Sequence, residues 1–505
     1  MVNPKVCLEE EELADYKPSS LSYEEMLFTI RQGLRPTQLP KKIIVAGAGM
    51  AGLVAASLLK KAGHSVTILE ANDRIGGRVY TLRYPFVDDL YLDVGAMRIP
   101  NTHHLVLAYL EKFRLPINEF KNTTPQDLIY ANGIKTNLRT YWQNPDILKY
   151  PVAPHEKGKT AEELLLSAIK PVIDFIQQDP LNNWPVVLKR FDSYSMGDFL
   201  RYNPVGASLS PGALEMVEVI IDLEGFLELA FTSILREFLP LLNLNMSYYE
   251  VEGGNDRLPK AFIPYLKEDI LLGHRMTKIR HHNDGKVTIR ATQTTSLRQL
   301  EFTADLAIVT VPFSVLSIID IEPRHTFSHN KYKAIRELHY ASSTKIGLQF
   351  THRFWEKEGL RGGKLITDMP IRFAYYPSHL IGSSGSGIIL ASYTWEDDTL
   401  PWDSLPESSR IRHALDNLAT VHGNSIYDAF LTGASQSWAH DRFTGGGAFS
   451  LFKPSQQTEL FPYIYAPEGS VHFAGDHTST LPAWMEGAIQ SGIRVAHEIN
   501  DLPRR

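Results

Sequence analysis

The chain has 505 residues, a length that predicts two or three domains rather than one core. Hydrophobic residues make up 43% of it, charged residues 21%, and the net charge is −6, which argues against nucleic acid or an anionic membrane as the main partner. The single cysteine, Cys7, excludes a disulfide framework and Cys-rich metal sites, and we expect no metal centre. No run of about 18 apolar residues occurs, and the acidic start lacks the apolar core of a secretion signal, so we expect a cytoplasmic protein.

The first predicted element is a short amphipathic helix in "SYEEMLFTIRQG". Ser22 and Glu25 have the spacing of a capping box, and the apolar residues that follow share one helical face. Residues 41–70 then predict a strand, a glycine turn, a helix and a second strand.

The middle of the chain, from Thr160 to about residue 239, is rich in predicted helix. Thr160 and Glu163 form a second capping-box pattern, and Ser210 stands as an N-cap before Pro211 at a first helical position. We therefore expect a helical segment between two regions that contain strands.

Strands return after the segment "GGNDRLP", residues 253–259. The run 306–311, which is apolar apart from Thr310, is typical of a strand buried in a parallel sheet. Further strands are expected around 344–350, 371–376 and 387–394, and the last unit, 470–499, predicts a strand, a turn and a helix.

A glycine triplet follows the strand expected at residues 43–46. Gly47, Gly49 and Gly52 have the G-x-G-x-x-G spacing, which allows a tight turn, close approach of a pyrophosphate, and close packing of helix on strand. Glu70 ends the next strand, where a carboxylate accepts hydrogen bonds from ribose hydroxyls. A purely structural turn is the alternative, but the order of strand, triplet, helix and acidic strand end favours a dinucleotide site.

The segment Gly76-Gly77-Arg78 favours FAD over NAD. An NAD site does not need a second glycine pair with an arginine at this point. A cofactor that continues beyond the pyrophosphate does, because backbone and guanidinium groups must meet a second set of polar atoms.

The segments "GAGMAGL", "LE" and "RIGGR" resemble the flavin amine oxidase family, and "FAGDHTS" is similar to its second flavin motif. The resemblance runs from about residue 41 to the end, with "EGGNDRLP" and "ADLAIVTVP" as further landmarks. It implies an α/β fold with a Rossmann-like FAD-binding domain, a mixed-sheet substrate domain and a helical insert. The expected ranges are 36–80, 245–330 and 465–505 for the FAD-binding domain, 1–35, 81–140 and 331–464 for the substrate-binding domain, and 141–244 for the helical domain.

The resemblance also implies how FAD is held. Asp476 stands where families often have glutamate, Trp438 resembles a tryptophan packed on the flavin, and Met276 resembles a residue whose backbone meets the adenine. Gly447 occupies the place of the cysteine that binds flavin covalently in monoamine oxidases, so we expect non-covalent FAD. The expected cofactor-binding residues are Gly47, Gly49, Met50, Ala51, Gly52, Glu70, Ala71, Gly77, Arg78, Gly95, Ala96, Met97, Arg98, Met276, Trp438, Gly475, Asp476, Trp484, Met485 and Ala488.

Arg98, in "DVGAMRIP", favours an amino acid over an amine as substrate. An arginine beside a flavin can hold a carboxylate with two parallel hydrogen bonds. The segment closely resembles "GPMRLP" of the venom-type L-amino-acid oxidases, in which that arginine binds the substrate carboxylate. A structural salt bridge is the alternative.

Other matches to the same oxidases imply further substrate contacts. Tyr393, with Ser392 as the fallback, matches a tyrosine that also bonds the substrate carboxylate, and Lys345 resembles a lysine that holds a water at flavin N5. Ala483 and Trp484 stand where the family lines the substrate site.

One position departs from the venom enzymes. Arg236, in "TSILREF", stands near the place of a histidine that has been proposed as a base. An arginine cannot be a base at ordinary pH, so we expect Arg236 to contact substrate instead.

These residues predict an L-amino-acid oxidase that uses FAD and O2 and gives a 2-oxo acid, ammonia and hydrogen peroxide by hydride transfer to the flavin. Lys345, Arg98 and Tyr393 are the expected catalytic residues. An L-amino-acid 2-monooxygenase shares the arginine clamp and stays open. A flavin amine or polyamine oxidase is disfavoured by Arg98 and by Ala448 in place of an expected tyrosine.

A non-enzymatic flavin-binding scaffold is the third alternative, and it would not need to retain Lys345, Tyr393 and Trp484 together. Beyond an L-amino acid and O2, the expected partner is a second copy of the chain, in a homodimer or tetramer, by analogy with the family.

Overall fold

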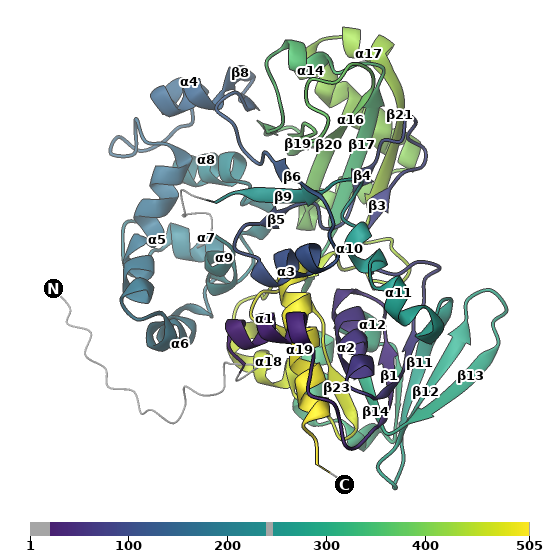
Figure 1. The fold of residues 1–505 in the computed structure, drawn as a ribbon. Helices are drawn as coiled ribbons and strands as arrows, with labels where there is room; N and C mark the ends of the chain where they lie inside the picture. The colour runs from purple at the N-terminus through teal and green to yellow at the C-terminus, as the bar shows by residue number, and fades with distance from the viewer. Residues whose placement is uncertain (1–20, 239–245, 504–505) are drawn as a thin grey trace.

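The structure is a computed structural model that describes residues 21–238 and 246–503. Cys7, the acidic start of the chain and residues 239–245 of the expected domain ranges lie outside the described residues. Two bodies are stacked in Figure 1, and the first and last helices of the described chain both lie in the lower one.

A parallel sheet of five strands forms the lower body, in the order β10-β2-β1-β14-β23. β1 (Lys42–Ala46) lies at its centre, with Ile43 aligned with Val66 on one side and Leu306 on the other. The remaining strands are β2 (Ser65–Leu69), β10 (Ile270–Leu271), β14 (Leu306–Val309) and β23 (Val471–Phe473). Every residue of β14 is buried, which confirms the buried parallel strand expected there.

Helices α2 (Met50–Lys61) and α19 (Met485–Asn500) cover one face of this sheet and pack on each other (Figure 1). Their axes come close at Gly492, where a Cβ atom would lie only 2.6 Å from the Ala51 carbonyl oxygen. Gly492 therefore serves the close packing of the two helices. α1 (Tyr23–Gln32), with the predicted Ser22–Glu25 capping box, and α3 (His104–Lys112) lie beside α19.

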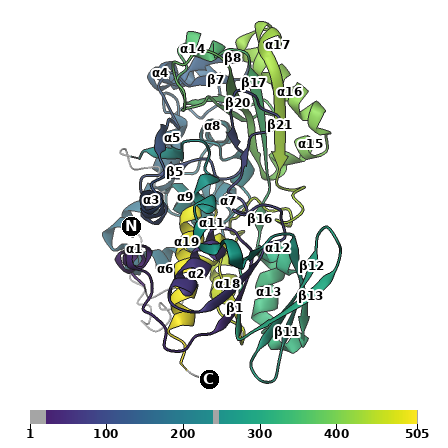
Figure 2. The same cartoon turned by 45° about the vertical axis from the view of Figure 1, so that its right-hand side comes forward.

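The opposite face of the parallel sheet is covered by a second sheet in the order β13-β12-β11-β15 and by helices. The strands are β11 (His274–His281), β12 (Val287–Gln293), β13 (Gln299–Ala304) and β15 (Asp320–Glu322), and the helices are α12 (Phe313–Leu316), α13 (His329–Glu337) and α18 (Gln456–Tyr465). Figure 2 brings this side of the molecule forward.

A mixed sheet of seven strands forms the core of the upper body, in the order β21-β17-β20-β19-β18-β7-β8. Its strands are β7 (Leu128–Ala131), β8 (Ile134–Asn137), β17 (Ser343–Phe350), β18 (Lys364–Thr367), β19 (Phe373–Tyr375), β20 (Gly387–Trp395) and β21 (Phe430–Ser437). β18 and β7 pair in parallel, the other neighbours are antiparallel, and α16 (Glu407–His422) packs on it. The strands expected near 344–350, 371–376 and 387–394 are β17, β19 and β20.

Three short pairings connect the bodies: β3 (Thr81–Leu82) with β4 (Leu92–Asp93), β5 (Ile99–Pro100) and β6 (Ile117–Phe120) on either side of β9 (Tyr248–Val251), and β16 (Tyr340–Ala341) with β22 (Phe449–Ser450). The smaller helices are α10 (Arg257–Lys260), α11 (Ile263–Leu266), α14 (Phe354–Lys357), α15 (Leu400–Asp403) and α17 (Ser425–Ala429).

The helical segment consists of α4 (Leu138–Gln143), α5 (Ala161–Gln178), α6 (Pro180–Phe191), α7 (Met196–Arg201), α8 (Pro211–Ile221) and α9 (Phe231–Phe238). Thr160 and Glu163 form the predicted capping box of α5, and Ser210 caps α8. None of the helices in the described part of the chain has the length and apolar composition needed to cross a membrane.

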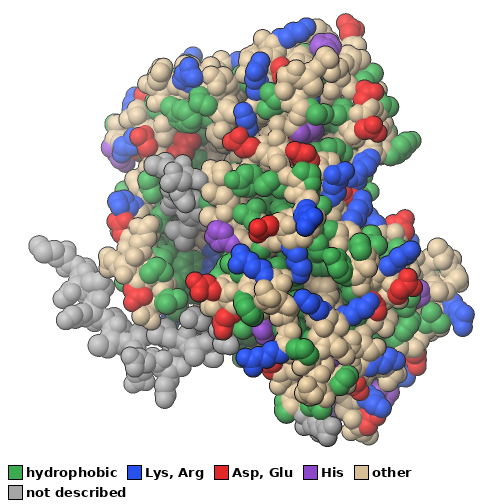
Figure 3. Space-filling model, in the orientation of Figure 1, with side chains coloured by type: hydrophobic (Ala, Val, Ile, Leu, Met, Phe, Trp, Pro, Cys, Tyr) green, Lys and Arg blue, Asp and Glu red, His purple; other side chains and the backbone are tan. Residues whose placement is uncertain are grey.

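The parallel sheet draws its strands from three separated pieces of sequence, as the discontinuous nucleotide-binding domain requires. The residue limits given for the three domains stay a prediction. Acidic and basic side chains are interspersed on the face in Figure 3, without one large field of a single sign.

Candidate active site

A cavity of about 540 Å³ runs from the carboxyl ends of β1 and β2 into the space between the mixed sheet and helices α8 and α9. Its volume lies in the range of ligand sites. The residues that line it come from segments far apart in sequence, and most of the predicted site residues are among them.

The glycine triplet forms the narrow end of the cavity. Gly47 has φ 115°, and a Cβ there would lie 2.4 Å from Thr310 Oγ1. Gly49 is the N-cap of α2, has no side-chain cap, and has no atom within 4 Å of where its Cβ would be. The first amides of α2 thus have open space before them, which fits a pyrophosphate.

Gly52 does not line the cavity. A Cβ there would lie 2.1 Å from the Gly47 carbonyl oxygen, so this glycine allows the turn to sit against α2 rather than contacting a ligand. It was expected among the cofactor-binding residues, and the structure gives it the packing role of the third glycine.

Glu70 lines the cavity at the end of β2, together with Ala71. Its two carboxylate oxygens accept the amide N–H groups of Ala48 and Asn72, both at 2.8 Å. Burial raises the pKa of this carboxyl, while these amides act in the opposite direction. The second lone pair on each oxygen leaves Glu70 able to accept ribose hydroxyls. Met276, from β11, lines the same end.

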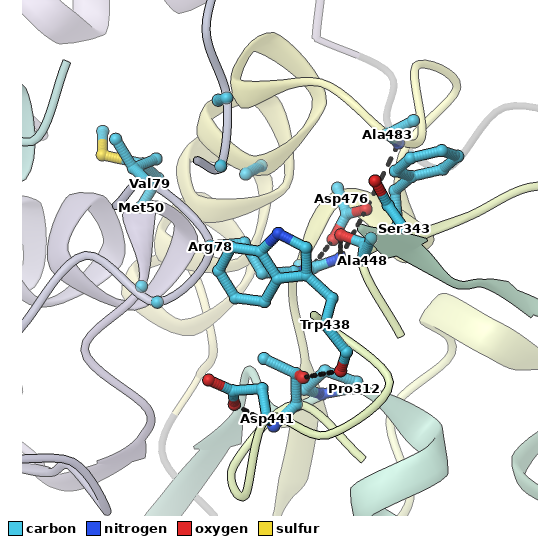
Figure 4. Close-up of a pocket in the computed structure, with 18 of the residues that line it drawn as sticks. Met50, Arg78, Val79, Pro312, Ser343, Trp438, Asp441, Ala448, Asp476 and Ala483 are labelled. Atoms are coloured by element: carbon cyan, nitrogen blue, oxygen red, sulfur yellow. Dashed lines mark hydrogen bonds and ion pairs between the residues drawn. The ribbon is translucent and has the colours of Figure 1, made fainter. Parts of the chain in front are cut away.

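Arg78 and Asp476 form a buried ion pair in the middle of the cavity wall (Figure 4). Arg78 also donates to the carbonyl oxygen of Ala448 at 3.1 Å. Burial raises the pKa of Asp476, but Arg78 and His477 outweigh it, and the pKa lies below its ordinary value. Two segments separated by about 400 residues are thereby fixed together, which the two flavin motifs require.

The chain from Gly475 to Ala488 forms the floor of the cavity. The Ala483 amide donates to Asp476 Oδ2 at 3.2 Å, and Ala483 takes the left-handed conformation with φ 68°. Trp484 is the N-cap of α19, so the helix begins at Met485 with its amino end toward the cavity. The partial positive charge of a helix N-terminus would stabilise an anionic cofactor edge here.

Trp438 belongs to the cavity wall (Figure 4) and bonds the segment that contains the next group of predicted residues. Its indole N–H donates to the Val94 carbonyl oxygen at 3.0 Å. Gly95, Ala96 and Met97 follow and all line the cavity.

Lys345 points from β17 into the cavity and is only 1% exposed. Its ammonium donates to the carbonyl oxygens of Gly95 at 2.7 Å and Asp93 at 3.3 Å, and it lies 4.3 Å from the centroid of the Tyr393 ring. Burial lowers the pKa of Lys345 to about 7, with Asp93 opposing the shift. The lysine therefore changes charge near neutral pH.

Arg98 lies on the same wall, just before β5. Its guanidinium donates to Asn122 Oδ1 at 2.6 Å and to the phenol oxygen of Tyr375 at 3.1 Å. Burial lowers the pKa of Arg98, but the neighbouring phenols, of which Tyr375 acts most strongly, raise it above its ordinary value. The group is therefore a permanent cation within the cavity.

No ion pair joins Arg98 to a carboxylate of any residue that the structure describes. A structural salt bridge, the alternative for this arginine, is thus not formed within that part of the chain. A buried cation held only by neutral groups is costly without an anion, and a ligand carboxylate would supply one.

Tyr393 and Ser392 are neighbours on β20 and point to opposite faces of the sheet. Tyr393 lines the cavity, whereas Ser392 is fully buried and donates to the carbonyl oxygen of Ile371 at 3.2 Å. The structure therefore places Tyr393 in the site. The phenol that bonds Arg98 is nevertheless that of Tyr375, which, like Asn122, had not been predicted.

Arg236 does not line the cavity. Its guanidinium donates to the Thr480 carbonyl oxygen at 2.8 Å and lies 4.4 Å from the Trp184 ring centroid. The next residue, Glu237, lines the cavity instead, as does Asp222 at the end of α8. The expected substrate contact of Arg236 is not supported by this position, and both carboxylates were missed.

A glycine turn at the carboxyl ends of a parallel sheet, continued by a wide cavity, is the arrangement expected of an enzyme that binds a dinucleotide cofactor. The chain belongs to the family described as flavin containing amine oxidoreductase, whose sequence model matches residues 50–500. The resemblance on the sequence motifs and the FAD cofactor are thereby confirmed.

Relatives extend over almost the whole chain. It is 51% identical to a Bacillus subtilis (strain 168) protein provisionally named L-amino-acid oxidase YobN, over 96% of this chain and 100% of that protein. It is 39% identical to the L-amino-acid oxidase of Siganus canaliculatus, over 95% and 89% of the two chains. The structure of cyclohexylamine oxidase from Brevibacterium oxydans IH-35A superposes with a TM-score of 0.73, 20% identity, and 92% and 99% coverage, which confirms the amine oxidase fold.

Proposed function

We propose that this protein is an L-amino-acid oxidase, and the observation that carries the proposal is Arg98. Its guanidinium is charged, faces the cavity and has only Asn122 and Tyr375 as hydrogen-bond partners. The carboxylate of an amino acid would complete a charge-assisted pair there. The similarity to proteins named L-amino-acid oxidase supports this proposal.

The proposed reaction is a two-electron oxidation of the amino acid followed by hydrolysis. The amino acid loses two electrons and two protons as its Cα–H and one N–H bond break, and water then replaces nitrogen to give a 2-oxo acid and ammonia. O2 takes up the two electrons and two protons as hydrogen peroxide. Bound FAD supplies the intermediate acceptor for the electron pair.

The side chains of this protein position the substrate. Arg98 binds the carboxylate, with the phenols of Tyr375 and Tyr393 beside it. With the carboxylate fixed, only one enantiomer directs its Cα–H bond toward the cofactor, so the clamp distinguishes L from D. Lys345 lines the same cavity, is held at Gly95 and is suited to hold a water there.

The residues that would hold FAD are the Gly47–Ala51 turn, Glu70, Arg78, Trp438 and the segment Gly475–Ala488. Gly447 has no side chain that could form a covalent bond to the flavin. A Cβ atom at this position would lie 2.7 Å from Tyr340. We propose that FAD is bound non-covalently and is released by acid precipitation of the protein.

A flavin amine oxidase is the second candidate, since a structural neighbour is a cyclohexylamine oxidase. An apolar amine would leave the Arg98 cation without an anion in a buried cavity. A 2-monooxygenase would use the same clamp and differ in its products, with an amide and CO2 in place of the 2-oxo acid and ammonia.

The test measures peroxide formation by the FAD-loaded protein with L-amino acids, their D enantiomers and the corresponding decarboxylated amines. Peroxide from the L-amino acids alone would support the proposal. Arg98→Met should then lower kcat/KM by about a hundredfold or more while flavin absorbance per chain stays constant. Arg139→Met, on the exposed surface of α4, is the control. Oxidation of the amines with undiminished rates in Arg98→Met would refute the proposal.

A further inference from the structure

Two carboxylates line the cavity close enough to Arg98 for its charge to act on both. Asp222 ends α8 in the left-handed conformation, with φ 67°, and Glu237 lies in the last turn of α9. Both residues belong to the cavity wall that contains Arg98, Tyr248 and Tyr375. No step of the proposed oxidation uses either of them.

Glu237 is held in place by one neutral partner. Its Oε2 accepts the indole N–H of Trp484 at 2.6 Å. The adjacent Arg236 makes no ion pair with it, because its guanidinium is directed to Thr480 and Trp184. The other carboxylate oxygen of Glu237 accepts no hydrogen bond from the described residues.

The backbone N–H of Asp222 donates to the Glu218 carbonyl oxygen, but its carboxylate has no hydrogen bond or ion pair with any residue that the structure describes. The charges that act on it are those of Arg372, Lys364 and Arg98, opposed by Asp398. Its carboxylate nevertheless lines the cavity, where a ligand would be its nearest polar partner.

The cations that act on these two carboxylates are shared with other groups. Arg372, Lys364 and Arg98 act on Asp222, but Lys364 also acts on Asp127, and Arg372 lies 3.5 Å from Asp398. Arg236 and Arg98 act on Glu237, and Asp192 acts on Arg236 as well. A substrate carboxylate at Arg98 would take up that cation and leave less positive charge near Asp222 and Glu237.

We propose that Glu237 and Asp222 select L-amino acids whose side chain ends in a cation, with lysine as the reference substrate. The inference rests on the proposed function, because Arg98 must first fix the α-carboxylate. Ile221, Phe226, Ile234 and Leu451 line the same part of the cavity and suit the methylenes of such a side chain. A neutral side chain would leave both carboxylates without a counter-ion.

The competing occupant is an acidic side chain, which Lys364 would attract. Lys364 lines the cavity, with its ammonium 5.2 Å from the centroid of the Phe373 ring. Two carboxylates would repel an acidic side chain, and Lys364 is itself shared between Asp222 and Asp127. The structure therefore favours the cationic class.

The first measurement compares kcat/KM for L-lysine, L-norleucine and L-glutamate with the FAD-loaded protein. L-norleucine has the same carbon chain as L-lysine but no terminal ammonium, so their ratio isolates the side-chain charge. We expect L-lysine to exceed L-norleucine by about tenfold to a hundredfold, the range of a charge-assisted hydrogen bond. L-glutamate should be the poorest of the three.

The second measurement is independent of turnover. 6-Aminohexanoate and hexanoate are the two substrates without their α-amino groups, and their binding is followed by calorimetry or by the flavin absorbance. 6-Aminohexanoate should bind more tightly by a similar factor. Glu237→Gln and Asp222→Asn should each narrow this gap, and Glu215→Gln, an exposed position on α8, should not.

The outcomes separate the two proposals. Preference for L-norleucine or L-glutamate, or a gap that persists in both carboxylate variants, would overturn the inference and leave the oxidase proposal standing. Oxidation of amines but of no L-amino acid would overturn the oxidase proposal itself. If one variant fails to retain FAD, the other still tests the inference.

Discussion

The Lys345 ammonium donates a hydrogen bond of 2.7 Å to the carbonyl oxygen of Gly95, three residues before Arg98. The same short segment contributes the Val94 carbonyl to Trp438 and contacts the backbone of Arg78 through Gly95. One stretch of chain thus holds Lys345 and Trp438 through its backbone and carries Arg98. Substitutions that shift the backbone of this segment should therefore affect the site more than substitutions that change only its side chains.

Gly95→Ala tests this relationship. A Cβ at Gly95 would lie 1.8 Å from the Arg78 carbonyl oxygen, so the segment must shift, and both FAD retention and kcat/KM should fall by at least about tenfold. The flavin content of the purified protein and steady-state rates measure the two effects. Gly206→Ala is the matched control, because its nearest atom would be at 3.5 Å on an exposed turn. Equal behaviour of the two variants would show that the Gly95 backbone is not critical.

The Arg78–Asp476 pair should carry much of the connection between the two flavin motifs. Asp476→Asn removes one partner of a buried pair, and we expect a loss of about 3–5 kcal/mol in unfolding free energy together with weaker FAD binding. Asp174→Asn breaks the exposed pair with Lys170 and should cost less than about 1 kcal/mol. Denaturant unfolding of both variants checks this, and a small effect of Asp476→Asn would contradict it.

The tyrosine that bonds Arg98 gives a third prediction. Tyr375→Phe removes the phenol at 3.1 Å from the guanidinium and should raise KM for amino acids by about tenfold. Ser392 points to the face of β20 that is turned away from the cavity, so Ser392→Ala should leave KM within about twofold. Steady-state kinetics with one L-amino acid suffice. A larger effect in Ser392→Ala than in Tyr375→Phe would contradict the assignment of the two faces.

The cofactor end of the site was largely predictable because its requirements are local. A tight turn needs Gly47, an open approach needs Gly49, and close packing needs Gly52, so spacing alone identifies the turn. The separate roles of the three glycines could be assigned only from the structure, in which Gly52 packs against the turn and does not line the cavity.

The substrate end was less predictable because its side chains come together only through tertiary packing. Tyr375 and Asn122 reach Arg98 from about 277 and 24 residues away in the sequence, and no local pattern marks them. The shift from Arg236 to Glu237 has another cause. Successive residues on a helix point about 100° apart, so alignment uncertain by one residue exchanges a cation for an anion in the cavity.

The last prediction concerns the pH dependence of the proposed side-chain preference. Burial raises the pKa of both Asp222 and Glu237 to about 7, and nearby cations only partly oppose the shift. Above that pH the carboxylates are charged and attract a cationic side chain. As the pH falls through about 7 they take up protons and the attraction is lost, while the lysine side chain stays charged throughout.

The kcat/KM ratio of L-lysine to L-norleucine should therefore fall as the pH is lowered from about 8 to about 6, a range that extends about one pH unit to each side of that pKa. Taking the ratio cancels the titration of Lys345 and of the substrate amine, which both substrates share. The doubly substituted Glu237→Gln, Asp222→Asn protein should show a low, flat ratio. A ratio that rises toward acid pH, or that keeps its pH dependence in the double variant, would place the titrating group elsewhere in the cavity.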